Sequence, residues 1–338
     1  MAPADGPVTI ALTMGDPRGI GPEIVVKALR SPELPVDARI VVVGALQVLR
    51  REAERLGQRF DLPLAERGET LAGQAAVTDL ANFSAQMLEP RKPEAVNGRA
   101  SLDYVETAAD MALAGEADAV VTCPINKAAI AAAGSPFAGH TEMLAHLTGA
   151  ARAVMLLVAG RLRVALATTH VALREVPGKL NAADIARTIT IVAEGLRRFF
   201  GVARPRIAVC GLNPHCGDGG RFGDEEARIV APALEDARRA GVPACGPKPA
   251  DTVFAQAADG RYDAVVALYH DQGMIPVKLA GLGRVVNVTL GLPIVRTSVG
   301  HGTAYDIAGR GRADEASLVE AMRLAARMAR TSREGPEL

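Results

Sequence analysis

Short apolar runs rich in β-branched residues alternate along this chain with longer segments of helical periodicity. Seven of these runs have the length and composition of buried strands. They span residues 40–44, 119–123, 154–158, 164–169, 207–211, 264–269 and 285–290. Helical spacing is clearest over residues 182–200, 224–240 and 316–330. The alternation predicts a layered α/β fold.

Two further features refine this fold. Residues 154–169, VMLLVAGRLRVALATT, predict a hairpin with its turn at Ala159, Gly160 and Arg161, so the sheet should be mixed rather than purely parallel. The chain has 338 residues, and domains usually contain roughly 100–200 residues, which favours two domains.

Composition narrows the functional classes. Lys and Arg number 38, as do Asp and Glu, so no excess charge indicates a nucleic acid or an anionic membrane surface as partner. The N-terminus lacks a basic region followed by a long apolar stretch, and no segment approaches the ~18 apolar residues of a membrane span. We expect a soluble, cytoplasmic protein whose four cysteines are reduced.

Three histidines each follow an apolar run: His170 after VALATT, His215 after IAVCGLNP and His270 after AVVALY. One such residue alone could be a structural histidine at a strand end. However, three of the six histidines in the chain share this placement. Because ligands of open α/β sheets bind outside the carboxyl ends of the strands, these imidazoles could converge on one divalent metal. We therefore expect an open metal site with positions left for substrate oxygens.

The segment TMGDPRGIGPE at residues 13–23 has glycines before the start of a predicted helix. Glycines permit close backbone approach and a helix N-terminus attracts anions, so the loop could bind an anion. A plain tight turn explains the pattern equally well, because the glycine spacing does not match the dinucleotide fingerprint.

The segment GHTEML at residues 139–144 begins another predicted helix. Here His140, Thr141 and the free backbone N–H groups could bind phosphate or carboxylate. Alternatively, Thr141 is the N-cap of the helix, with Glu142 nearby.

A third group lies within 27 positions near the C-terminus and comprises His270, Asp271, Lys278, Asn287 and Arg296. Lys and Arg can bind phosphate or carboxylate, Asn adds directional hydrogen bonds, and His and Asp suit a metal. Any one of them could be a surface residue, but the clustering favours a site.

The motifs occur in an order that resembles a known family. MGDPRGIGPEI, VTCPINKAAI, GHTEML, ATTHVALREV, GLNPHCGDGGRFGDEE, HDQGMIPVK and NVTLGLPIVRTSVGHGTAYDIAG are similar to the successive signatures of the 4-hydroxythreonine-4-phosphate dehydrogenase family of pyridoxal phosphate (pyridoxine) biosynthesis. The resemblance extends from about residue 10 to residue 315.

The resemblance implies an isocitrate/isopropylmalate dehydrogenase-like fold of two α/β/α domains with a mixed sheet, forming a homodimer with the active site in the interdomain cleft. We expect a cofactor-side domain of residues 1–138 plus 292–338 and a metal, substrate and dimerisation domain of residues 139–291. The implied metal ligands are His170, His215 and His270, and the implied metal is Zn, Mg, Co or Mn.

The resemblance also implies the residues that contact small molecules. The implied substrate contacts are His140, Thr141, Lys278, Asn287 and Arg296, and the implied cofactor is NAD or NADP. The stretch HGTAYDIAGRG at residues 301–311 is similar to a loop that surrounds the adenosine of the dinucleotide in the wider superfamily. The implied cofactor contacts are therefore His301, Gly302, Ala304 and Asp306.

Two positions depart from the family pattern. Arg18 stands where the family commonly has Ala, and Gly300 replaces the Asp of SVDHGTA. Both changes make the surroundings more positive, which would suit a substrate that lacks the ammonium group of a threonine derivative. Arg18 could equally be a solvated loop residue.

The implied reaction is the oxidation of a secondary alcohol in a phosphorylated hydroxy acid, with loss of CO2 from the resulting β-keto acid. The substrate would be 4-phosphohydroxy-L-threonine or D-threonate or D-erythronate 4-phosphate, with Lys278 and Asp271 as the candidate catalytic residues. One alternative is a dihydrodiol dicarboxylate dehydrogenase of the same family, which shares the Gly of SVGHG but lacks GHTEML. The other is a non-redox metal-dependent lyase or hydrolase, because the same three histidines could serve it.

Overall fold

The computed structural model describes residues 6–69 and 73–335, which form two compact units. The first unit contains the chain up to Ala153 together with Leu292–Arg333, and the second contains Val154–Gly291. The chain leaves the first unit after Ala153 and returns to it at Leu292. Helix α5 (His140–Leu147) belongs to the first unit and packs against another of its helices. The domain roles expected for residues 1–138 plus 292–338 and for 139–291 stay predictions.

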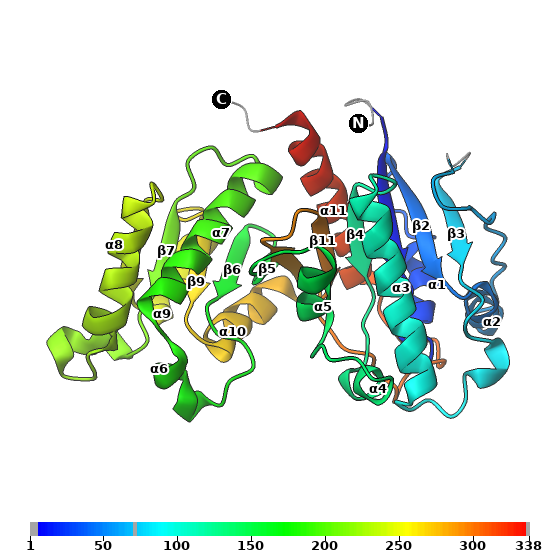
Figure 1. Ribbon diagram of the computed structural model, residues 1–338, viewed down its shortest axis with the longest axis horizontal. Coiled ribbons are helices and arrows are strands. Elements are labelled where there is room, and N and C mark those ends of the chain that lie inside the picture. The colour runs from blue at the N-terminus through cyan, green and yellow to red at the C-terminus, as the bar shows by residue number, and fades with distance from the viewer. Residues whose placement is uncertain (1–5, 70–72, 336–338) are drawn as a thin grey trace. The chain divides into compact units, whose positions relative to one another are not determined.

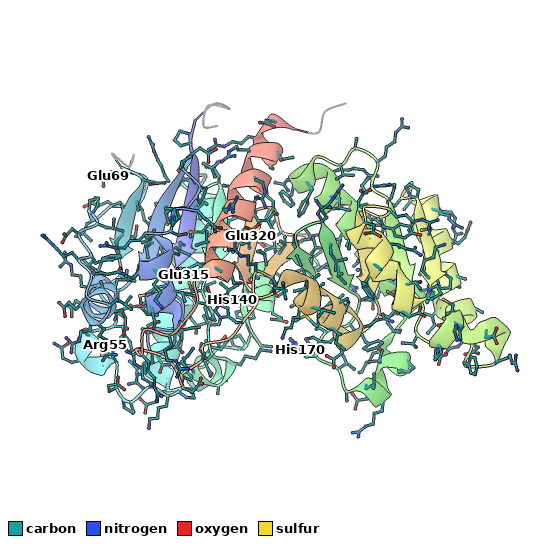
Figure 2. All side chains as sticks on the ribbon, turned by 180° about the vertical axis from the view of Figure 1, so that it is seen from behind. Arg55, Glu69, His140, His170, Glu315 and Glu320 are labelled. Atoms are coloured by element: carbon teal, nitrogen blue, oxygen red, sulfur yellow. The ribbon has the colours of Figure 1, made fainter. Side chains whose placement is uncertain are left out.

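The first unit is built on parallel strands in the order β3-β2-β1-β4-β11. The strands are β1 (Val8–Thr13), β2 (Ala38–Gly44), β3 (Ala75–Asp79), β4 (Ala119–Thr122) and β11 (Val295–Val299). The helices are α1 (Gly21–Ala28), α2 (Leu46–Arg55), η1 (Ala85–Met87), α3 (Ala95–Leu113), α4 (Lys127–Ala132), α5 and α11 (Ala316–Glu334). Helix α3 covers one face of these strands (Figure 1), and α11 lies on the opposite face (Figure 2).

The second unit has strands in the order β10-β5-β6-β9-β7-β8, with β5 antiparallel to both of its neighbours. The strands are β5 (Val154–Ala159), β6 (Leu162–Leu166), β7 (Ile207–Cys210), β8 (Ala244–Lys248), β9 (Ala264–Ala267) and β10 (Val286–Leu290). The helices are η2 (Leu173–Glu175), α6 (Val176–Lys179), α7 (Ala182–Phe200), η3 (Pro214–Gly220), η4 (Glu226–Val230), α8 (Ala231–Arg239), α9 (Ala250–Ala258) and α10 (His270–Gly281). Helices α7 and α8 cover one face of these strands and α9 and α10 the other (Figures 1 and 2).

All seven apolar runs are strands, and the mixed α/β fold is confirmed. The hairpin is also confirmed, because Ala159 pairs with Leu162 and the turn residue Gly160 has a φ of 57°. Four strands, β1, β3, β8 and β11, were not expected. Two of them have sequences that conceal a strand: β8 contains Gly-Pro, and β11 carries Arg, Thr and Ser although all five of its residues are buried.

The predicted helices are present, and the ends of α7 are set by residues next to it in the sequence. Helix α7 spans the predicted residues 182–200, because the Asn181 side chain accepts a hydrogen bond from the Asp184 N–H (2.8 Å) and Gly201 ends the helix in the left-handed region. The 224–240 segment divides into the π-helical turn η4 and α8. Across the described ranges, no helix combines the length and apolar character needed to span a membrane.

Candidate functional site

Three adjacent parallel strands of the second unit, β6, β9 and β7, are each followed by one of the histidines singled out from the sequence. His170 lies four residues beyond β6, His270 is the first residue of α10 after β9, and His215 lies in the loop after β7. Carboxyl ends of adjacent parallel strands meet at one edge of a sheet. The fold therefore directs all three residues to the same edge.

His170 and His270 lie next to each other, with ring centroids 5.6 Å apart. Two imidazoles that bind one ion through nitrogen at about 2.1 Å have ring centres roughly 5 Å apart, so this spacing suits a shared metal. The Nδ1 atom of His270 is 2.7 Å from Oδ1 of Asp271, and a carboxylate in that position orients a ligating imidazole. Figure 2 labels His170 near α10.

His215 is not part of this pair. Its ring lies beside Phe222, with 6.5 Å between the centroids, in the loop Pro214–Gly220. Five consecutive residues of this loop, His215 to Gly219, have positive φ values between 44° and 81°. Among the described residues, no group of three or more His, Cys, Asp or Glu side chains is placed to hold a metal. The structure thus brings together two of the three predicted ligands.

Glu226 fixes the strand end that leads to His215, and sequence reasoning missed this residue. Its carboxylate is 5% exposed and accepts hydrogen bonds from the backbone N–H of Leu212 (2.8 Å) and of Asn213 (2.7 Å) and from the Asn213 amide (3.0 Å). Burial raises the pKa of Glu226, but these hydrogen bonds outweigh burial and leave that pKa below its ordinary value. An acidic residue soon after a glycine-rich loop was the available signal.

The other predicted residues of the second unit differ in exposure. Lys278 lies on the exposed side of α10. Asn287 lies in β10, and its Oδ1 atom is buried without a hydrogen-bond partner in the described chain. A buried amide oxygen without a partner is costly unless a ligand satisfies it.

In the first unit, Arg296 of β11 forms a buried cationic centre. Its side chain is among the largest fully buried ones, and Nη2 donates to Oγ1 of Thr122 at 2.7 Å. Burial lowers the pKa of Arg296 to about 10, and the charge of Glu142 opposes this shift. Burying a guanidinium is costly unless partners offset the cost, and the anion-binding role of Arg296 stays a prediction.

His140, which is labelled in Figure 2, is the first residue of α5 and lies within range of the Arg296 charge. Its Nε2 atom is buried and has no hydrogen-bond partner in the part of the chain that is described. Burial and the charge of Arg296 lower the pKa of His140 well below its ordinary value, so the ring is neutral near pH 7. Thr141 is the second helical residue and Gly139 the N-cap, so the alternative of a Thr141 N-cap is wrong.

The predicted cofactor loop is exposed at the residues implied to bind. His301, Gly302 and Asp306 are exposed, and Nδ1 of His301 is 3.1 Å from the Gly302 carbonyl oxygen. Ala304 has a φ of 42°, an unusual value for a residue with a side chain, and such strain clusters at ligand sites. An exposed carboxylate such as Asp306 suits the hydroxyls of a ribose.

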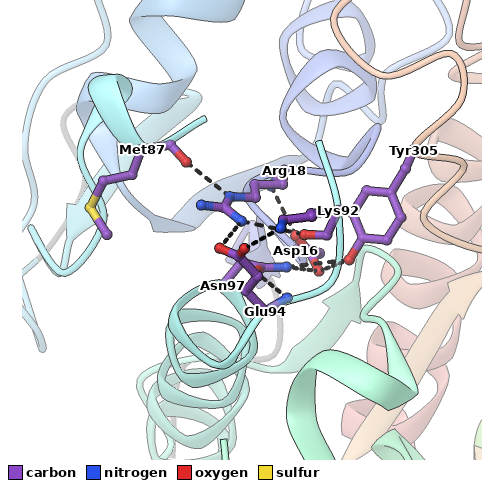
Figure 3. Close-up of polar contacts among 7 residues, drawn as sticks. All are labelled: Asp16, Arg18, Met87, Lys92, Glu94, Asn97 and Tyr305. Atoms are coloured by element: carbon purple, nitrogen blue, oxygen red, sulfur yellow. Dashed lines mark hydrogen bonds and ion pairs between the residues drawn. The ribbon is translucent and has the colours of Figure 1, made fainter. Parts of the chain in front are cut away.

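Arg18 matches neither of the roles considered for it from the sequence. It is 4% exposed, so it is not a solvated loop residue. Its Nε donates to the Met87 carbonyl (2.9 Å) and its Nη1 to the Glu94 carboxylate (2.6 Å), which pairs its charge (Figure 3). Arg18 is therefore not an uncompensated cation that could attract a substrate anion.

The chain is similar to known proteins over most of its length. The family model for "Pyridoxal phosphate biosynthetic protein PdxA" matches residues 36–325. The 4-hydroxythreonine-4-phosphate dehydrogenase of Desulfosudis oleivorans is 51% identical over 94% of both chains, and the D-threonate 4-phosphate dehydrogenase of Salmonella typhimurium is 45% identical over 95% of this chain and 99% of its own. A crystal structure of 4-hydroxythreonine-4-phosphate dehydrogenase from Klebsiella pneumoniae aligns with a TM-score of 0.88, at 42% identity, over 96% of this chain and 99% of that one. The family model and the relatives each match well over half of the chain, and the chain therefore belongs to the PdxA family of pyridoxal phosphate biosynthetic proteins.

Proposed function

We propose that this protein is a dehydrogenase that oxidises the secondary alcohol of a phosphorylated hydroxy acid, with NAD or NADP as the hydride acceptor and a divalent metal ion. The observation that carries the proposal is the similarity, over nearly the whole chain, to two dehydrogenases whose names both specify a 4-phosphate substrate. The candidate substrates are 4-phosphohydroxy-L-threonine, D-threonate 4-phosphate and D-erythronate 4-phosphate.

Each unit contains candidate contacts for the substrate's anionic groups. The first unit contributes Arg296, which Thr122 holds in place, and the neutral His140 with Thr141 at the start of α5. A guanidinium can form two parallel hydrogen bonds to phosphate or carboxylate. The second unit contributes Lys278 and the buried Oδ1 of Asn287, which would accept a hydrogen bond from a substrate hydroxyl.

The metal would be held by His170, His215 and His270, since neutral imidazoles are common ligands of divalent transition metals. The spacing of the His170 and His270 rings and the Asp271 contact to His270 fit this role, and His215 would join them when the ion binds. Such an ion polarises an alcohol oxygen and lowers its pKa.

The dinucleotide would be bound by His301, Gly302, Ala304 and Asp306, with the Asp306 carboxylate accepting hydrogen bonds from a ribose. The bound dinucleotide would accept the hydride. Lys278 and Asp271 are the candidate groups for removing the hydroxyl proton, because both are exposed on α10 and Asp271 contacts His270. Oxidation at the carbon β to the carboxylate gives a β-keto acid, so decarboxylation would follow while Arg296 or Lys278 holds the remaining anion.

A homodimer is part of the proposal. Ile275, Leu279 and Leu282 are 67%, 76% and 85% exposed. Ile275 and Leu279 lie one turn apart on α10, and Leu282 directly follows this helix. Large exposed apolar patches usually mark interaction surfaces. A second copy of the chain is the simplest partner for this surface.

A cytoplasmic location stays a prediction.

The deciding experiment measures NADH or NADPH formation by absorbance with each of the three phosphorylated acids and their unphosphorylated parents, in the presence of Zn, Mg, Co or Mn. We expect turnover with at least one phosphorylated acid and its loss after metal chelation. Equal turnover of a phosphorylated acid and its parent would reopen the dihydrodiol dicarboxylate alternative. Substrate consumption without reduction of the dinucleotide would instead favour the non-redox lyase or hydrolase.

A further inference from the structure

The segment 303–313 is hydrogen-bonded to other parts of the first unit at several positions. The Thr303 carbonyl accepts a hydrogen bond from the Ile20 N–H at 2.9 Å. Gly19 is required beside it, because a Cβ there would lie 2.9 Å from the Thr303 oxygen. Farther along, Glu23 accepts a hydrogen bond from the Ala313 N–H at 2.8 Å. Of the residues implied to bind the dinucleotide, Ala304 and Asp306 lie between these attachments, and Asp306 is exposed.

Tyr305 makes a further attachment between the proposed cofactor contacts Ala304 and Asp306. Its hydroxyl donates to Oδ2 of Asp16 at 2.5 Å, although 289 residues separate the two in sequence. Asp16 is fully buried and also accepts hydrogen bonds from the Asn97 amide (2.8 Å) and from the Arg18 N–H (2.9 Å). Figure 3 shows these donors around the carboxylate.

The donors are themselves fixed. Asn97 and Glu94 form a capping box at the start of α3, in which Oδ1 of Asn97 accepts from the Glu94 N–H at 2.9 Å. The Glu94 carboxylate in turn pairs with Arg18. Burial raises the pKa of Asp16, and the hydrogen bonds from Tyr305, Arg18 and Asn97 oppose this shift. The ionised carboxylate therefore depends on these donors.

We propose that the Asp16 carboxylate and the Tyr305 hydroxyl latch the segment 303–306 in the shape that presents Asp306 to the dinucleotide. They are positioning residues and act on the cofactor only through the loop. The inference rests on the proposed function, because it takes residues 301–306 as the cofactor site. The proposal also gives a role to Asp16, the acidic residue at the start of the loop at residues 13–23. From the sequence alone, that loop could have been either an anion site or a plain turn.

The test compares Tyr305→Phe, which removes one hydroxyl, with Tyr104→Phe as a matched control. The Tyr104 hydroxyl is buried in the same unit and has no hydrogen-bond partner in the described chain. In the full-length protein, we expect Tyr305→Phe to speed amide hydrogen exchange in residues 303–307. We also expect it to weaken NAD binding roughly three- to tenfold, with kcat changed by less than about twofold. Tyr104→Phe should change neither the amide hydrogen exchange of residues 303–307 nor NAD binding.

Asp16→Asn provides a second variant, because its amide keeps one acceptor oxygen for Tyr305 and should weaken NAD binding less than Asp16→Ala does. Unchanged exchange and unchanged NAD binding in Tyr305→Phe would overturn the latch. Faster exchange without weaker NAD binding would also overturn it, provided that Asp306→Ala does weaken NAD binding. If Asp306→Ala leaves NAD binding intact, the cofactor placement itself fails, and that failure is visible independently of the exchange data.

Discussion

Arg296 in the first unit and His270 in the second both belong to the predicted site, yet their surroundings differ. Arg296 is 2% exposed and donates to Thr122 within a buried setting, whereas the His270 side chain is 36% exposed and contacts the still more exposed Asp271. The same contrast separates Asp16, with three donors, from His215, which lies in a loop of left-handed backbone and contacts the Phe222 ring.

The difference indicates two ways of building a site. Buried charges in the first unit are held by fixed partners before any ligand arrives, which reduces the ordering needed on binding. The histidines of the second unit are accessible, and an ion would draw them together. The free energy of metal binding can offset the cost of ordering a loop. Substitutions should therefore affect the second unit mainly through metal content and the first unit through anion binding and stability.

The largest effect should come from the histidines. Replacing His170, His215 or His270 by Ala should remove the bound metal and lower kcat at least about a thousandfold, because the polarisation of the alcohol is lost. Thermal stability of the metal-free protein should barely change. Metal analysis and steady-state kinetics measure this, with the exposed His146→Ala as control. Full metal content in two of the three variants would disprove the shared site.

The next effect should come from the cations. Arg296→Met or Lys278→Met removes a charge-assisted contact worth about 1.5–3 kcal/mol, or roughly ten- to a hundredfold in kcat/KM. The variant that loses the phosphate contact should impair a phosphorylated acid far more than its parent. The exposed Arg204→Met serves as control. Equal losses on both compounds would assign the cation to the carboxylate or to catalysis.

Arg18 tests whether a buried charge of the first unit acts on stability alone. Arg18→Ala removes the ion pair with Glu94 and the hydrogen bond to the Met87 carbonyl, and should lower the free energy of unfolding by about 1–3 kcal/mol. Because the charge is paired, the ratio of activities on the three phosphorylated acids should stay the same. Denaturant unfolding measures the first quantity, with the exposed Arg174→Ala as control. A changed ratio with unchanged stability would restore Arg18 as a substrate selector.

Glu226 extends the comparison to a fixed carboxylate in the second unit. Its folded-state pKa is lowered, so its stabilising contribution is present above the unfolded pKa of about 4.3 and is lost as the pH falls through the folded-state value. Glu226→Gln should lower stability by about 1 kcal/mol at pH 7 and remove part of the acid sensitivity. Melting curves between about pH 3 and pH 7 test this against the exposed Glu235→Gln. Parallel curves for wild type and Glu226→Gln would contradict it.

Local pattern predicted much of the fold and some of the site. The placement of His170 and His270 after β6 and β9 follows from apolar runs that end just before them. The displacement of His215 could not be predicted, because it depends on a left-handed turn that no residue pattern specifies. Arg18 was misjudged because its partner Glu94 lies 76 residues away.

The sequence by itself determined the alternation of strands and helices, the ends of α7 at Asn181 and Gly201, and membership of the family, since each depends on neighbouring residues or on motifs in order. Only the tertiary structure decided which buried charges meet. Asp16 and Tyr305 lie 289 residues apart, and Thr122 and Arg296 lie 174 apart. Their hydrogen bonds exist because the chain returns to the first unit at Leu292 and adds β11 beside β4, a path that no local pattern encodes.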